Sequence, residues 1–222
     1  MRRAALAGAI ALGGLVAGLA TGGCGVGDPV SQTRTVGGFE RLEVEGSIDL
    51  EIRLSNRPEP GVRITAGEKT IDRIRTEVRD GTLRLTTRSE GLVIGPNPIG
   101  DVSVSLGVPA LAGLEVVGDS SVSLSGLSAK RLDMRVRGSG DITARGRVDA
   151  LAVEIDGSGD TDLGGLSAQT AQIRTDGSGQ IDLRVSELLE IVSEGSGDIL
   201  YRGRPRIVSR IEGSGDVRQV AG

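Results

Sequence analysis

Apolar and polar residues alternate along most of the chain, in short segments separated by glycine. The clearest alternation surrounds five copies of Gly-Ser-Gly followed by Asp or Gln, at residues 138–141, 157–160, 177–180, 195–198 and 213–216. Two, four and six positions before the first glycine of each copy, most residues are aliphatic, with polar residues between them. A period of two predicts a β-strand with one inward face. We therefore expect an all-β chain with a strand on each side of every glycine turn.

The five copies start 19, 20, 18 and 18 residues apart, a fixed period that is typical of solenoids. A unit of two short strands cannot bury its own inner face, so neighbouring units must stack. Parallel pairing of equivalent strands, about 4.8 Å apart, would turn each aliphatic position into a buried column. The pattern predicts a right-handed, single-stranded parallel β-helix. A degenerate copy, with Asp119-Ser120-Ser121 in place of the turn, extends the repeats over residues 112–222.

Residues 39–111 are less regular but keep the same character. Apolar residues alternate across residues 42–52, and residues 78–85 indicate two strands joined at an Asp-Gly turn. Residues 68–75 favour one polar helical turn, and the prolines of residues 95–98 mark a loop. We expect an irregular β part here, continuous with the repeats.

The N-terminus has the features of an export signal. Arg2 and Arg3 precede an uncharged run, and small residues lead to Cys24, the only cysteine. We predict a lipoprotein-type signal peptide over residues 1–23, a lipid-anchored flexible tether over 24–38 and a β-helical domain over 39–222. Thr21 stands where a lipobox usually has Leu, so an uncleaved membrane anchor and a plainly cleaved secreted protein stay open. Each alternative exports the domain, and lipid on Cys24 would hold it at the cell membrane or outer membrane.

Composition indicates what kind of core the chain can form and which partners are not expected. The chain has 36 glycines but one Phe, one Tyr and no Trp, so its core must consist of thin aliphatic layers. The formal net charge is −4, and removal of Arg2 and Arg3 with the signal peptide makes it more negative. Nucleic acid is therefore excluded as an expected partner.

The glycine copies are predicted to be corners of the coil, because glycine supplies positive φ or close backbone contact. The predicted turn-forming residues are Gly138, Gly140, Asp141, Gly157, Gly159, Asp160, Gly177, Gly179, Gly195, Gly197, Asp198, Gly213, Gly215 and Asp216. Each aspartate is expected to accept hydrogen bonds from backbone N–H groups of its own turn. The alternative is Ca²⁺ held between stacked carboxylates. Gln180 interrupts that column, and no cofactor or metal is predicted.

The residues that carry most enzyme chemistry are missing. The sequence has no His, and Tyr201 is the only side chain suited to stacking on a sugar. We predict a non-enzymatic structural or adhesive module, with a carbohydrate-active β-helix enzyme as the alternative. The outward arginines form either a solvated surface or a strip that docks anionic wall polymer, for which the Arg-Gly-Arg-Pro-Arg segment at 202–206 is the best candidate.

Three segments resemble a known bacterial family. They are Phe-Glu-Arg-Leu-Glu-Val-Glu-Gly-Ser-Ile-Asp-Leu at 39–50, Asp-Gly-Thr-Leu-Arg-Leu at 80–85 and the Gly-Ser-Gly-Asp copies. The chain resembles the "putative autotransporter adhesin, head GIN domain" family, also called DUF2807, over about residues 39–220. The resemblance implies a β-helical domain exposed on the envelope, and it supplies no catalytic residues. The expected ligand is an envelope or extracellular polysaccharide or protein.

The last rung lies close to Gly222 and has no helix to cover it. An uncovered strand edge is a template for pairing with another strand. We expect either edge-to-edge self-association or a strand from elsewhere in the chain folded over this end.

Overall fold

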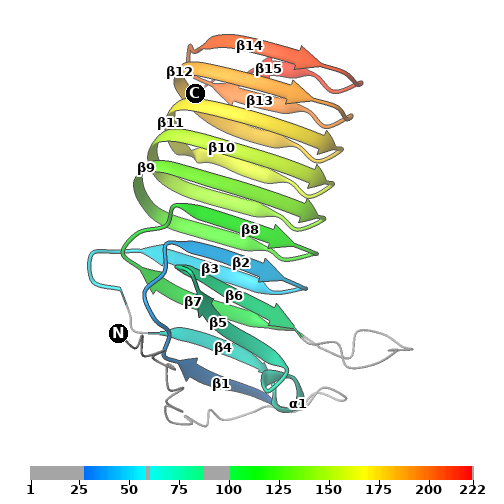
Figure 1. Cartoon of the computed structure of the whole chain (residues 1–222). Coiled ribbons are helices and arrows are strands. Elements are labelled where there is room, and N and C mark those ends of the chain that lie inside the picture. Colours follow the sequence, from blue (N-terminus) through cyan, green and yellow to red (C-terminus); the bar gives the residue numbers. More distant parts are fainter. Residues whose placement is uncertain (1–27, 59–60, 88–100, 222) are drawn as a thin grey trace, which may run out of the picture.

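The computed structural model describes residues 28–58, 61–87 and 101–221. The predicted signal peptide, Cys24 and the loop at 95–98 lie outside these residues. The fifteen strands of the described part belong to one continuous sheet that winds into a coil. The C-terminal half is a parallel β-solenoid of about five turns with rungs of about 20 residues, and the N-terminal half is a mixed sheet, as Figure 1 shows.

Four long strands form the centre of the solenoid. They are β9 (Val122–Gly138), β10 (Ile142–Gly157), β11 (Thr161–Gly177) and β12 (Ile181–Ser193). Each begins after a glycine turn, bends and ends at the next turn, so its two halves lie on two opposite faces of the coil. We call the face made by the first halves the first face, and the other the second face. β13 (Ile199–Arg202) and β15 (Val217–Gln219) continue the first face, and β14 (Arg206–Ile211) continues the second.

The strand register confirms the aliphatic columns predicted from the repeat. Leu132, Leu151, Ala171 and Leu189 are partners in successive parallel strands. All four are at most 3% exposed, and so are the members of the column two residues further along, Met134, Val153, Ile173 and Ile191. Each column supplies one ladder of aliphatic side chains, and together the ladders form a continuous core without large aromatic residues.

The N-terminal half adds rungs in an order that differs from the order along the chain. β2 (Arg41–Glu45) pairs in parallel with both β8 (Gly113–Val117) and β6 (Thr82–Thr87). β3 (Asp49–Leu54) pairs in parallel with β7 (Ser103–Val108) and β9. The later segment β6–β7 therefore forms a rung beneath the earlier segment β2–β3.

Antiparallel strands close the N-terminal end, which we call the base. β1 (Pro29–Arg34) pairs with β4 (Val62–Gly67), and β5 (Ile74–Arg79) pairs with β6. The helical turn predicted from the polar residues is α1 (Glu68–Ile71), between β4 and β5. The predicted Asp-Gly hairpin joins β5 to β6, with a φ of 49° at Asp80 and 73° at Gly81.

The tether predicted over residues 24–38 is corrected by β1. Pro29–Arg34 forms six register pairs with β4, and the Ser31 and Thr65 hydroxyls are hydrogen-bonded at 2.8 Å. Small polar residues suggested a linker, but β4 needed an edge partner and this segment supplies it. Residues 29–34 therefore belong to the folded body.

Arg34 links the two faces across the base. Its guanidinium donates to the Ile71 carbonyl at 2.9 Å, to the Thr76 hydroxyl at 2.7 Å and to the Ile74 carbonyl. Desolvation lowers the pKa of Arg34, and the carboxylate of Asp72 partly offsets this effect. A half-buried polar contact therefore connects β1, α1 and β5 at the base.

Candidate functional site

The glycine turns line one long edge of the coil, which we call the turn edge. Gly138 needs its glycine for backbone reasons, since its φ is 133°. Gly159 is not among the described residues with positive φ, yet a Cβ there would overlap the carbonyl oxygen of Gly140 in the rung below. The same overlap recurs at Gly140, Gly179, Gly197 and Gly215, and at Gly157, Gly177, Gly195 and Gly213. Close stacking of rungs therefore excludes side chains from both glycine positions.

The aspartates of the turns connect neighbouring rungs. Asp141 Oδ1 accepts a hydrogen bond from the Asp160 amide at 2.8 Å, and Asp160 Oδ1 accepts one from the Gln180 amide at 2.8 Å. Asp198 Oδ1 accepts one from the Asp216 amide at 3.0 Å. The donor thus belongs to the next rung, whereas the sequence led us to expect a donor in the same turn. Among the described residues no group of three acidic side chains is placed to hold a metal ion.

The turn edge has an earlier turn at Gly46, where the sequence has no Gly-Ser-Gly copy. Ser120 is buried and donates to the Gly46 carbonyl at 2.9 Å, while it accepts from the Ile48 amide at 3.1 Å. The Gly46 segment is therefore an earlier turn of the same edge, and a Cβ at Gly118 would overlap the Gly46 carbonyl. Ser120 takes the place of a turn glycine because its side chain binds the rung below.

A shallow groove of about 560 Å³ runs over the second face. Its floor contains the small residues Gly113 and Ala152, which lie in one column with Arg41, Asp133 and Gln172. Longer charged side chains rise on both sides of this column. This concavity is not evident from the periodicity, because small residues on an outward position carry no apolar signal.

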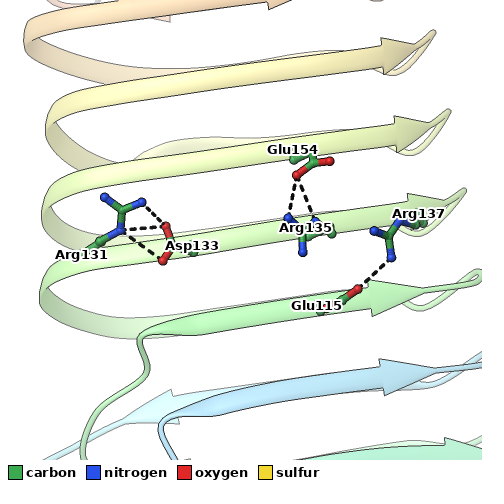
Figure 2. A network of polar contacts seen from close by, with 6 residues as sticks. All are labelled: Glu115, Arg131, Asp133, Arg135, Arg137 and Glu154. Carbon is green, nitrogen blue, oxygen red and sulfur yellow. Dashed lines mark hydrogen bonds and ion pairs between the residues drawn. The ribbon is translucent and has the colours of Figure 1, made fainter. Parts of the chain in front are cut away.

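Ion pairs join charged side chains along the second face, as Figure 2 shows. Arg135 contacts Glu154 at 2.9 Å, and Arg137 contacts Glu115 at 2.8 Å. The hydrogen bond and charge of Glu154 raise the pKa of Arg135. Arg131 and Asp133 form a similar pair at 2.7 Å within β9. Exposed pairs of this kind each contribute about 0–1 kcal/mol, so they set the character of the surface more than its stability.

The strand bends line the opposite long edge of the coil (Figure 1). Arginine is frequent at and near these bends. We define the cationic edge as the six residues Arg145, Arg147, Arg184, Arg202, Arg204 and Arg206. Arg184 and Arg202 are direct register partners, and Ser167 separates Arg184 from Arg147 in the same column. Only Arg202 of the six has an ion pair with a described acid, Asp182.

A depression of about 530 Å³ lies at the end of the cationic edge. Its lining includes the side chains of Arg184, Arg202, Arg204 and Gln219. Arg202 is half-buried beside Asp182, so it is held in place, while Arg184 and Arg204 are exposed. The predicted 202–206 segment therefore lies on a concave, cationic surface and is joined there by Arg184, which sequence spacing did not connect to it.

The two long edges carry opposite charge. On the turn edge, acids outnumber the basic residues Arg137 and Arg218. The acids are the half-buried Asp198 and the exposed Asp119, Asp141, Asp156, Asp160, Asp176, Glu194, Glu212 and Asp216. Near the bends, the six arginines of the cationic edge outnumber the acids among them, which are Asp149, Asp162, Asp182 and Glu187. The cationic edge is therefore a positive strip on a chain whose net charge is negative.

Solved structures share this fold. A "putative adhesin" from Bacteroides fragilis has 20% identity and a TM-score of 0.69, covering 86% of this chain and 97% of its own. A "putative lipid binding protein" from Parabacteroides distasonis has 24% identity and a TM-score of 0.51, covering 86% and 96%. A "putative adhesin" from the same species has 20% identity and a TM-score of 0.51, covering 87% and 98%. None of the three is described as an enzyme.

No curated protein is detectably similar to the chain in sequence. Residues 38–205, most of the chain, match the family described as "putative auto-transporter adhesin, head GIN domain". The match spans the mixed N-terminal part as well as four of the five Gly-Ser-Gly copies. This match over most of the chain shows that the chain belongs to the "putative auto-transporter adhesin, head GIN domain" family.

Proposed function

We propose that the chain is a non-enzymatic adhesive module, held to the membrane by lipid on Cys24, that binds an anionic envelope or extracellular polymer through its cationic edge. Membership of an adhesin family implies a location at the cell surface, outside the cytoplasm. The cationic edge is the observation that carries the proposal. It concentrates arginines that mostly lack acidic partners among the described residues, beside a concave surface.

The geometry of the edge suits a linear polymer with repeated negative charge. Rungs of a parallel sheet are about 4.8 Å apart, so the backbones of the register partners Arg184 and Arg202 place two arginine side chains on adjacent rungs. Guanidinium forks bind phosphate and carboxylate groups in a bidentate manner. An acidic polysaccharide or a phosphate-containing wall polymer offers such groups along one line.

The alternative of a carbohydrate-active enzyme receives little support from the groove. A glycosidase needs two carboxylates free to act as acid and as base or nucleophile. The carboxylates of Glu43, Glu115 and Glu154 in the groove each bind an arginine, and Glu190 accepts from Gln172 at 2.7 Å. We therefore place the ligand at the cationic edge and not in the groove.

Charge reversal tests the binding surface. The Arg184→Glu/Arg204→Glu variant should lose most of its retention on purified native envelope, because both exposed guanidinium groups lie in the depression. The matched control is Arg75→Glu/Arg79→Glu, which makes the same change of net charge on β5. Equal retention of both variants and the unchanged chain would refute the cationic edge as the binding surface.

Lipid attachment has a separate test. Cys24→Ser should abolish incorporation of labelled fatty acid and release the protein from the membrane fraction. Labelling that persists in Cys24→Ser would show that Cys24 is not the attachment site. Release without loss of binding to isolated envelope polymer would separate anchoring from adhesion.

A further inference from the structure

The C-terminal end of the coil, which we call the tip, leaves a strand edge uncovered. Among the described residues β14 pairs only with β12, and β15 pairs only with β13 (Figure 1). The exposed large hydrophobic residues of the described chain are Ile207, Val208 and Ile211, at 38%, 49% and 40%, and all three belong to β14. The aliphatic core thus reaches the solvent at this end. Among the described residues β1 and β5 are edge strands of the base, but neither carries an exposed large hydrophobic side chain.

The free edge has a defined set of hydrogen-bonding groups. The Glu212 amide donates to the Ser193 carbonyl at 2.7 Å, so even-numbered residues of this segment direct their backbone groups toward β12. Backbone groups alternate sides along a strand, and Ile207, Ser209 and Ile211 therefore present theirs to the solvent. The register places the same three side chains above the buried Leu189, Ile191 and Ser193.

An antiparallel second copy of β14 fits this edge in one register. With Ser209 opposite Ser209 of the second copy, Ile207 faces Ile211, and inward side chains meet inward side chains as the sheet requires. On the outer surface Arg206 then faces Glu212 of the second copy. Charges of opposite sign directly across a strand pair are stabilising.

The neighbouring registers are electrostatically unfavourable. A shift by two residues in one direction places Arg206 opposite Arg210 of the second copy, and a shift in the other direction places Arg210 opposite Arg210. Like charges directly opposite destabilise a strand pair. Charge complementarity therefore selects the register centred on Ser209 and selects a second copy of this chain as the occupant.

We propose that the chain binds a second copy of itself, tip to tip, by two-fold antiparallel pairing of β14 centred on Ser209. The pairing would supply acceptors and donors to the free edge and cover Ile207 and Ile211. β1 begins at the base a few residues after Cys24, so an anchored molecule carries its tip at the end away from the membrane. The tips of molecules on two facing membranes can then meet, which makes the contact homophilic and adhesive. This last step rests on the proposed lipid anchor.

Disulfide trapping tests the register. In the full chain with Cys24→Ala, Ser209→Cys supplies the only thiol. Residues in a hydrogen-bonded antiparallel pair are about 5.5 Å apart at Cα, within the range of a disulfide. Ser209→Cys should form a covalent dimer under mild oxidation in detergent. Arg206→Cys is the control, because its two copies would lie roughly 20 Å apart along the strands. Equal trapping of both variants, or none, would overturn the register.

Exchanging the charges of Arg206 and Glu212 tests the same register through the affinity of the dimer, with substitutions at exposed positions that should leave the chain folded. Arg206→Glu alone and Glu212→Arg alone should each weaken dimerisation roughly tenfold, because each affects two symmetric pairs. The double variant should recover the affinity seen before substitution. Sedimentation equilibrium measures all three. Filaments in place of dimers would show head-to-tail contact with the base and would overturn the proposal, as would failure of the double variant to recover.

An experiment with vesicles distinguishes failure of the tip-to-tip contact from failure of the proposed function. Lipidated chain on vesicles of phosphatidylethanolamine and phosphatidylglycerol should cluster them, and Arg206→Glu should reduce the clustering. Trapping in detergent without clustering of decorated vesicles would retain the dimer and overturn contact between membranes. Binding to envelope polymer without trapping or clustering would overturn the dimer and leave the proposed function standing.

Discussion

Gly159 lies directly above Gly140 in the stacked turns, and a Cβ atom would overlap the Gly140 carbonyl oxygen. Even Gly159→Ala must push two rungs apart, so we expect a loss of roughly 1–3 kcal/mol in the free energy of unfolding. Gly37→Ala is the control, since a Cβ there has no atom within 4 Å. The thermal midpoint of unfolding measures both. An unchanged midpoint for Gly159→Ala would show that the turn can relax without cost.

Asp160 shows what the turn aspartates contribute. Its carboxylate accepts from the Gln180 amide, so Asp160→Ala should destabilise the fold by about 1 kcal/mol, while Asp160→Asn keeps an acceptor and should cost less. Asp216 is the matched control, because its rung is the last of the described coil. Urea unfolding compares the three variants. If Asp216→Ala costs as much as Asp160→Ala, the bond between rungs is not the source of the effect.

Thr161 occupies a core column between Ile142 and Ile181, and its buried hydroxyl has no hydrogen-bond partner. Thr161→Val keeps the shape of the side chain and removes the unpaired polar atom. We expect stabilisation by about 1 kcal/mol, measured by urea unfolding. Leu163→Val, a smaller residue at another buried position of β11, should instead destabilise. A loss of stability in Thr161→Val would indicate a hydrogen bond made by a bound water.

At the scale of elements, sequence reasoning succeeded where one rule repeats. The period of two and the recurrence of glycine predicted two short strands in each rung and their buried columns, because every rung packs against equal neighbours. The structure joins short strands across the bend into the long strands β9–β12, which the sequence did not predict. The base could not be predicted in this way. β1 has little apolar alternation, and its place beside β4 depends on long-range pairing. The order in which β6–β7 lies beneath β2–β3 likewise leaves no local pattern.

The same distinction applies to the candidate surfaces: local clusters were predictable from the sequence, and contacts between rungs were not. The arginines of 202–206 were predictable as a local cluster, but their union with Arg184 depends on the register of β12 with β13. The aspartate column was predictable, although its hydrogen bonds run between rungs and not within a turn. Short patterns report what one rung does; contacts between rungs become visible only when the stacking is known.

Arg34 provides a test of the base as an element. Arg34→Ala would leave the Ile71 and Ile74 carbonyls without this donor and disconnect β1 from β5. We expect a loss of about 1–3 kcal/mol. Faster amide exchange should be confined to β1, α1 and β5, because rungs of a solenoid contact only their neighbours. Arg79→Ala, which removes an exposed pair with Glu77, is the control. Uniform acceleration across β9–β11 would contradict local control of the base.

At the scale of the whole molecule, the base, the two long edges and the tip of the coil are distinct surfaces that face different directions. The base lies at the N-terminal end of the coil and the open tip at the opposite end (Figure 1). The two long edges between them carry opposite charge. A longer or shorter coil would keep this arrangement, because each added rung extends the same columns and edges. Length can therefore vary without loss of either proposed contact, provided that the base and the tip remain.

Deletion of one complete rung tests this modular construction. Removal of residues 142–160 joins Asp141 to Thr161, and the register shows that Thr161 can replace Ile142 above Val122. The shortened chain should fold with the same β-rich circular dichroism and a lower thermal midpoint, since one layer of core is lost. Removal of residues 142–151 instead should abolish cooperative unfolding, because the remaining half rung cannot reach its column. If both deletions unfold the chain, the rungs are not interchangeable, and the stability of the coil depends on features particular to each turn.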